Sequence, residues 1–161
     1  MSSVLPLMRV SSGGPLRDPV NLPSEYSRQA AKSALELRYS LLAYFHSLFH
    51  EANSRGVPVA RPIFFDFPAD KLTWTIDEQF MIGPALMASP VFYKDAVTVP
   101  VYLPNDTVWY HFISGHQLDG TGEAVSITSL RKELVLLLRG GYIVPYQVSW
   151  PVVSHSQFHV A

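Results

Sequence analysis

Four carboxylates, Asp66, Asp70, Asp77 and Glu78, lie close together in the middle of the chain. Acid–base hydrolysis of a glycosidic bond needs two such groups, one to protonate the leaving oxygen and one to attack the sugar or activate water. Their setting favours a structural role, because Asp70 lies in the turn "PADK", and Asp77 and Glu78 lie where a strand is predicted to begin. Carboxylates at such positions commonly accept hydrogen bonds from backbone amides. We interpret all four as structural.

Two histidines, His46 and His50, are spaced to share one face of a helix, and Glu51 follows the second. A zinc protease helix instead needs the glutamate directly after the first histidine, where it activates a metal-bound water. The chain also has no cysteine, which excludes disulfides, Cys-based zinc sites and a thiol nucleophile. We therefore interpret the histidines as a helix-packing pair and expect no metal or other cofactor.

Other motifs of known chemistry are weak. No serine lies in a Gly-x-Ser-x-Gly elbow, and "SSGGPLRDP" lacks the Lys-Ser/Thr end of a phosphate-binding loop. Asn105-Asp106-Thr107 is a formal N-glycosylation acceptor, but a plain turn is the better interpretation. Five aromatic residues offer a sugar-stacking platform, although alternating aromatics in strands more often fill a core. They are Trp74, Tyr93, Trp109, Tyr110 and Phe112.

The charge balance argues against polyanionic partners. The 161 residues carry a formal net charge of -1, and their 12 Lys and Arg residues form no basic run. No apolar run approaches the ~20 residues that span a bilayer, and the start of the chain makes a poor signal peptide. We expect a soluble protein with no nucleic-acid partner and no membrane partner, in a compartment that the sequence leaves open.

The segment from Ser24 to Arg55 is helical in character. Ser24 is suited to cap a helix, no Gly or Pro interrupts the segment, and Gly56 and Pro58 supply the stop. The pattern predicts one long helix, or two with a kink. Apolar residues surround its second half almost completely, so this helix needs partners on more than one side.

Beyond Arg61 the chain changes to short apolar runs separated by turn residues, which predicts strands. Val97–Leu103 and Thr107–Ile113 bracket "PND", a tight turn at the tip of a predicted hairpin. A helix followed by many short strands indicates an α+β fold with an antiparallel sandwich or small barrel. The predicted runs are "RPIFFDF", "QFMIG", "ALMASPVF", "VTVPVYL", "TVWYHFI", "AVSIT", "ELVLLL" and "YIVPY".

Several segments in order together resemble the family 31 glycoside hydrolases, which include α-glucosidases and maltases. They are "RYSLLAYFHSLFHEA", "GVPVARPIFFDFPAD", "DEQFMIGPALMASPV", "VYLP" followed by "WY", and "LRGGYIVPYQ". The resemblance covers roughly Leu5 to Gln147. It implies that residues 1–60 are the end of a (β/α)₈ barrel with its last helix, that 61–147 are the β-sandwich that follows, and that 148–161 diverge.

The resemblance also implies what this chain does. The family's two catalytic aspartates lie on earlier barrel strands, so the chain resembles a carboxy-terminal part of an enzyme that hydrolyses an α-linked oligosaccharide or glycoside. Alone we expect it to be inactive. Arg9, in "PLMRVSS", matches a family arginine and is a candidate substrate-binding residue, while Ser11 stands where the family usually has a substrate-contacting histidine.

Three further expectations follow. Gly83 and Pro84 are expected to shape a bend between two strands, so that Asp77 to Val91 holds the fold together. The helix is expected to leave an apolar face uncovered, so that the isolated chain self-associates and a piece from about Val59 to Gln147 behaves better. The alternatives to an enzyme fragment are a free-standing carbohydrate-binding sandwich, using Trp74 or Trp109, and a structural remnant.

Overall fold

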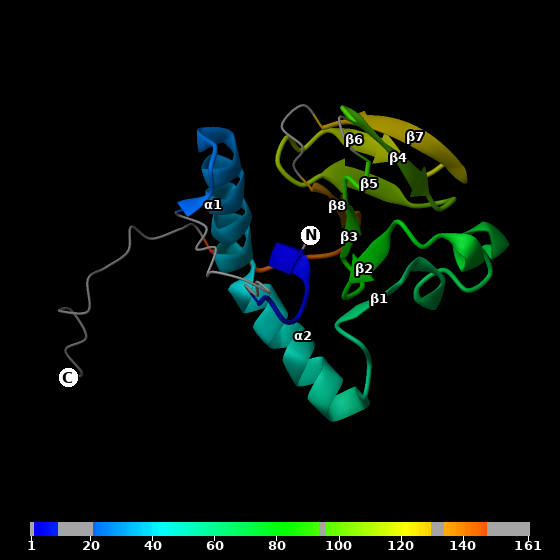
Figure 1. The fold of residues 1–161 in the computed structure, drawn as a ribbon. Helices are drawn as coiled ribbons and strands as arrows, with labels where there is room; N and C mark the ends of the chain where they lie inside the picture. The colour runs from blue at the N-terminus through cyan, green and yellow to red at the C-terminus, as the bar shows by residue number, and fades with distance from the viewer. Residues whose placement is uncertain (1, 10–20, 94–95, 130–133, 148–161) are drawn as a thin grey trace.

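The computed structural model describes residues 2–9, 21–93, 96–129 and 134–147. Ser11 and the divergent segment 148–161 lie outside these residues. Two α-helices precede all the strands (Figure 1). The helical elements are η1 (Ser2–Val4), α1 (Glu25–Ser40), α2 (Leu42–Arg55), η3 (Ile63–Phe65) and η4 (Lys71–Thr75). The strands are β1 (Ala60–Pro62), β2 (Phe80–Ile82), β3 (Leu86–Ser89), β4 (Thr98–Leu103), β5 (Val108–His111), β6 (Gln117–Asp119), β7 (Glu123–Thr128) and β8 (Val135–Arg139).

The structure confirms the predicted start and end of the helical segment, at Ser24 and Gly56. The Ser24 hydroxyl accepts a hydrogen bond from the Ser27 amide at 3.0 Å and caps α1. The segment is divided at Leu41, whose side chain is fully buried, and α2 ends at Gly56 in the left-handed conformation, with φ 71°. Two helices with a break are therefore present. Within the described part of the chain, neither helix combines the length and apolar character needed to cross a membrane.

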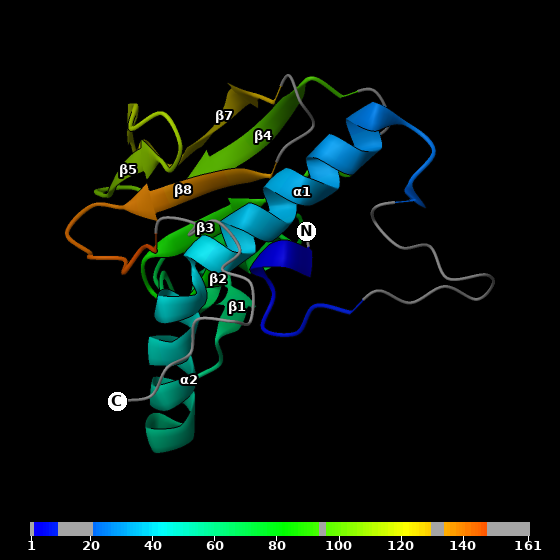
Figure 2. The same ribbon diagram turned by 90° about the vertical axis from the view of Figure 1, so that its left-hand side faces the viewer.

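The described strands form two antiparallel sheets. The larger has the order β1-β2-β3-β8-β5-β6, and the smaller pairs β4 with β7. The helices cover one face of the larger sheet, and the smaller sheet lies against the other (Figures 1 and 2). Side chains of β8 alternate accordingly: Leu136 faces the helices, while Val135 and Leu137 face the smaller sheet. The α+β class and its β-sandwich are confirmed.

The bend at Gly83 joins β2 to β3 directly beneath α2. Gly83 has φ 57°, and a Cβ there would overlap both the Leu48 side chain and the Tyr44 hydroxyl. The Tyr44 hydroxyl donates to the Ile82 carbonyl at 2.8 Å and accepts from the Ala85 amide at 3.3 Å. The hairpin thus needs a glycine both for its backbone conformation and for its contact with the helix.

The predicted strand Arg61–Phe67 is wrong beyond Pro62. Only Ala60–Pro62 pairs with β2, and the chain then turns into η3. The amides of Asp66 and Phe67 both donate to the Ile63 carbonyl, at 3.0 and 3.1 Å. Proline supplies no donor to continue the ladder, and these turn bonds draw the chain away from the sheet.

The predicted hairpin around "PND" is also wrong in its pairing. The turn exists, with Asp106 at φ 57°, but β4 pairs with β7, whereas β5 lies between β6 and β8. The turn therefore connects the two sheets. Strand β6 was not predicted, and Tyr142–Tyr146 is not a strand, because Gln147 leads to the helices and donates its amide to the Ser40 carbonyl at 2.8 Å.

Candidate functional site

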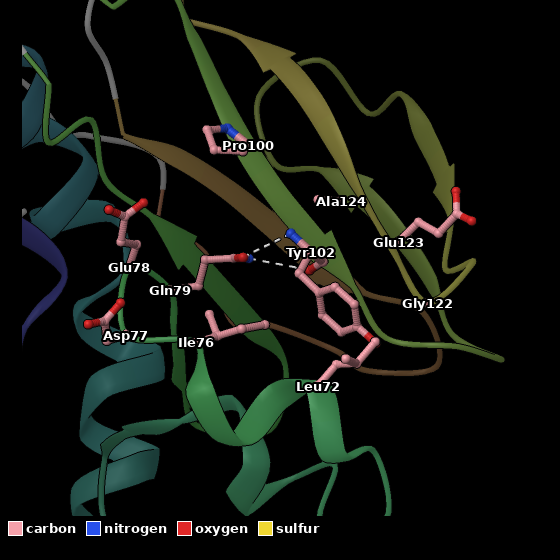
Figure 3. Close-up of a pocket in the computed structure, with 10 residues that line it drawn as sticks. All are labelled: Leu72, Ile76, Asp77, Glu78, Gln79, Pro100, Tyr102, Gly122, Glu123 and Ala124. Carbon is pink, nitrogen blue, oxygen red and sulfur yellow. Dashed lines mark hydrogen bonds between the residues drawn. The ribbon is translucent and has the colours of Figure 1, made fainter.

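A groove of about 480 Å³ lies at the free edge of β4, where η4 and the start of β2 approach the smaller sheet (Figure 3). We call it the edge groove. Its floor is apolar and its rim carries three carboxylates. The lining residues are Leu72, Ile76, Asp77, Glu78, Gln79, Pro100, Tyr102, Gly122, Glu123 and Ala124.

Gln79 closes this edge by behaving like a neighbouring strand. Its Oε1 accepts from the Tyr102 amide at 2.8 Å, and its Nε2 donates to the Tyr102 carbonyl at 3.3 Å (Figure 3). Pro100, two residues earlier on the same edge, has no N–H to satisfy. Unpaired strand edges invite association with other chains, and prolines and side-chain partners prevent it. The buried Gln79 amide therefore joins the two sheets.

Asp70 is confirmed as a structural carboxylate. One of its oxygens accepts from the Leu72 amide at 3.1 Å and so caps η4, while the other accepts from the Tyr102 hydroxyl at 2.6 Å. Burial of Tyr102, together with the Asp70 carboxylate, raises the pKa of the phenol to about 12. Asp70 thus fixes η4 against β4.

Asp66 forms a closed pair with Arg61. Both guanidinium contacts measure 2.8 Å, and the two side chains are only 6% and 11% exposed. The guanidinium also lies 4.9 Å from the centre of the Phe65 ring. A buried, bidentate pair of this kind is costly to break from one side. The Asp66 carboxylate is therefore engaged in holding the turn after β1.

The last two carboxylates differ from each other. Glu78 accepts from the Tyr93 hydroxyl at 2.7 Å, and this bond raises the pKa of the exposed phenol. For Asp77 the described residues provide no hydrogen bond or ion pair. In the view of Figure 3 its carboxylate lies on the side of Gln79 away from Tyr102. Asp77 is thus the carboxylate left free for a ligand.

The predicted packing role of the two histidines on α2 is wrong. His46 and His50 are both exposed on α2, and among the residues that the structure describes no three His, Cys, Asp or Glu side chains are grouped to hold a metal ion. At the sequon, exposed Asn105 accepts a hydrogen bond on its carbonyl from the Thr107 hydroxyl at 3.1 Å. This is turn geometry.

The aromatic candidates fall into two groups. Trp109 is 0% exposed and packs between the two sheets against Phe67, so the preferred interpretation of a core residue is confirmed for it and the alternative of a carbohydrate platform is excluded. Tyr110 and Phe112 are half-buried. Trp74 and Tyr93 are exposed. Of this group, Trp74 and Tyr93 therefore provide the exposed aromatic surface.

The N-terminal segment is held by an arginine that the sequence reasoning did not single out. Arg38 of α1 donates to the carbonyls of Ser3, Leu5 and Pro6 at 3.2, 2.7 and 3.2 Å. Val4 is thereby fully buried in the helix-side core. Arg9, the predicted substrate-binding residue, lies just beyond this anchored stretch with its side chain exposed. Arg9 does not line the edge groove, and it is distant in sequence from all the residues that do.

Comparison with known proteins identifies the family. The model of the glycosyl hydrolase family 31 C-terminal domain matches residues 56–144, more than half of the chain. The chain belongs to glycosyl hydrolase family 31. The family 31 match begins at the glycine that ends α2 and runs through both sheets.

Relatives in the family are much longer proteins. Lysosomal alpha-glucosidase of Mus musculus is 37% identical over 142 residues, which cover 77% of this chain and 15% of that protein. Intestinal sucrase-isomaltase of Oryctolagus cuniculus is 37% identical over 119 residues, covering 74% of this chain and 6% of the relative. The chain spans between 5% and 15% of the length of the curated relatives that it matches first.

Solved family 31 structures share the fold. A GH31 alpha-xylosidase from Xanthomonas citri superposes with a TM-score of 0.85 at 28% identity and covers 90% of this chain and 16% of its own. A Flavobacterium johnsoniae GH31 dextranase complexed with glucose gives 0.77 at 27% identity over 83% of this chain and 16% of its own. The likeness therefore extends well beyond the matched domain's 56–144.

The family-like segments coincide with structural joints. "DEQFMIGPALMASPV" contains the Gln79 amide that bridges the sheets and the Gly83 hairpin beneath α2. "RYSLLAYFHSLFHEA" begins at Arg38, which anchors the N-terminal segment. A single glutamine before an apolar run and a single arginine in a helix carry no periodic signal, so only the fold exposes these roles.

Proposed function

We propose that this chain is the C-terminal structural part of a family 31 α-glycosidase, an enzyme that hydrolyses O-glycosidic bonds of α-linked oligosaccharides or glycosides. The superposition on a family 31 alpha-xylosidase over 90% of the chain carries this proposal, because it takes in the helical region as well as the sandwich. Several curated relatives are alpha-glucosidases, which favours glucose as the sugar.

The helical region is proposed to be the end of a catalytic barrel, with residues 61–147 as the following sandwich. Supporting this division, only Ser40 of α1 is buried, although the helix carries several apolar residues. A helix with so little cover is typical of an element that packs on further structure. Arg9, which precedes α1 in the chain, is proposed to contact the substrate.

On its own the chain is proposed to be inactive. Retaining glycosidases hold two carboxyl groups about 5–5.5 Å apart across the sugar, and one of them must attack the anomeric carbon. Asp66, Asp70 and Glu78 are each engaged by a different partner, in three separate arrangements. Of these four candidates Asp77 alone has no such partner among the described residues, and one carboxylate is insufficient for this chemistry.

An activity assay tests the proposed inactivity of the isolated chain. The purified chain is incubated with an aryl α-glucoside, and we expect release of the aryl group at the rate of the buffer blank. Turnover well above the blank that is abolished by Asp66→Asn, Asp70→Asn or Asp77→Asn would overturn the proposal. If turnover survives all three substitutions, repurification must remove it for the proposal to stand, because only activity lost on purification belongs to a contaminating enzyme.

A further inference from the structure

A second groove, of about 500 Å³, lies beside the edge groove on the other side of the segment that enters β2. The two grooves share Ile76, Asp77 and Gln79 in their linings. The second contains three aromatic residues, of which Phe64 and Trp74 are exposed and Phe80 is half-buried, and we call it the Trp74 groove. No role in the fold accounts for its exposed aromatic surface.

Trp74 is held so that its ring remains available. Its indole N–H donates to the Pro68 carbonyl at 3.2 Å, which satisfies the only donor of the side chain and orients the ring. The side chain is nevertheless 58% exposed, and Phe64 is 41% exposed. Large aromatic side chains gain much free energy when they are covered, so an oriented and exposed pair is suited to receive a flat apolar surface.

The charged groups of the Trp74 groove determine which ligand charge it favours. The Arg61 charge is neutralised by the bidentate Asp66, whereas Asp77 has no ion-pair or hydrogen-bonding partner in the described part of the chain. The uncompensated charge at the groove is therefore negative. Such a site disfavours phosphates and carboxylates, and its free oxygens accept hydrogen bonds from hydroxyl groups.

A pyranose ring meets both requirements, because its C–H face is apolar and its edge is lined with hydroxyl donors. We propose that the Trp74 groove binds a neutral sugar ring of an oligosaccharide, with the ring stacked on Trp74 and Phe64 and a hydroxyl donating to Asp77. The adjoining edge groove gives room for a following sugar unit beyond Asp77. Binding requires only residues of this chain and is independent of hydrolytic activity.

Isothermal titration calorimetry of the full chain tests this inference, with linear α-1,4-linked maltotetraose and its β-linked counterpart cellotetraose as probes. We expect saturable binding of at least one, weakened about tenfold by Trp74→Ala because one aromatic stack and its covered area are lost. Asp77→Ala should weaken binding severalfold. Trp74→Phe, which keeps a ring in place, should restore most of the affinity.

Tyr39→Ala provides the matched control, since it removes a similarly exposed aromatic residue from α1, which does not line either groove. Its affinity should equal that of the unmodified chain. Absence of saturable binding of both tetrasaccharides, or equal affinity of the Trp74→Ala and unmodified chains, would overturn the inference. Because the titration measures binding alone, its failure leaves the proposed inactivity of the isolated chain to be decided separately by the aryl glucoside assay.

Discussion

The larger sheet and helix α1 represent opposite extremes of burial within one chain. Every residue of β3 is buried, because one of its faces meets α2 and the other meets the smaller sheet. In α1 only Ser40 is buried. The difference shows that the sandwich with α2 forms a complete core, whereas α1 contributes little to it.

Local interactions, and not a buried core, stabilise α1. Ser24 caps its N-terminus, Glu25 pairs with Arg28 at 2.6 Å, and Lys32 lies 3.9 Å from Glu36. Exposed pairs of this type contribute about 0–1 kcal/mol each. Arg38 adds the anchor to the N-terminal segment. Residue substitutions in the sheet and in α1 should therefore have very different consequences.

The largest expected difference in the free energy of unfolding is between a leucine-to-alanine substitution in the larger sheet and one in α1. Leu137 is fully buried between the sheets, and Leu137→Ala should lower the free energy of unfolding by about 2–5 kcal/mol through lost burial and a cavity. Leu35 of α1 is half-buried and belongs to neither core cluster. Leu35→Ala should cost less than about 1 kcal/mol. Urea denaturation measures both, and equal losses would break the comparison.

Much of the fold was predictable where a local signal specifies the structure. Ser24 and Gly56 carry the chemistry of a cap and a stop, and the structure confirms both. The strands β2, β3, β4, β5, β7 and β8 were predicted because each coincides with a short run of largely apolar, strand-forming residues. Gly83 was predicted to shape a bend for a similar reason, since glycine before proline favours a turn.

The errors arose where long-range pairing decides the structure. Nothing local tells that β4 pairs with β7 rather than with β5 across the tight turn, because the choice depends on which sheet buries each strand. Strand β6 has polar Gln117 and Asp119 exposed, so it has no apolar pattern to detect. The candidate site shows the same limit: the engaged state of Asp66 depends on Arg61, and the burial of Trp109 depends on the opposing sheet.

A rise in pH should weaken the contact that Tyr44 makes between α2 and the Gly83 hairpin. Burial raises the pKa of Tyr44 to about 12, above its ordinary value of 10.0. A group whose folded-state pKa is raised contributes stability that is present below about pH 10 and is lost as pH rises toward 12. The stability difference between the unmodified chain and Tyr44→Phe should therefore shrink between pH 9 and about pH 12. Tyr102 acts in the same direction in both proteins.

The matched control for this titration is Tyr39→Phe, at a tyrosine of α1 that is 63% exposed. Urea denaturation should show only a small difference in the free energy of unfolding between this variant and the unmodified chain, because the ring is exposed. A difference for Tyr44→Phe that stays constant up to pH 12 would show that the Tyr44 hydroxyl titrates as it does in the unfolded chain, contrary to its buried position between α2 and the Gly83 hairpin.

Substitution of exposed apolar residues of α1 and α2 is expected to have the smallest effect on stability. It should nevertheless have a measurable effect on self-association. A chain that starts at Val59 lacks α2, which covers Ile82, Leu86 and Leu136 of the larger sheet, so the fold predicts new exposed apolar surface rather than better behaviour. Point substitutions are therefore the cleaner test. Tyr39 and Leu42 are exposed apolar side chains at the junction of α1 and α2.

Replacing both Tyr39 and Leu42 with lysine should change the free energy of unfolding by less than about 0.5 kcal/mol for each position, since neither side chain is buried. Light scattering should nevertheless report less self-association than for the unmodified chain, because exposed apolar patches drive association and charge opposes it. Val97→Lys, at an exposed apolar residue just before β4, is the control on the sandwich and should leave association unchanged. If Val97→Lys reduced association and the helix substitutions did not, the associating surface would belong to the sandwich, and α1 would be adequately covered as it stands.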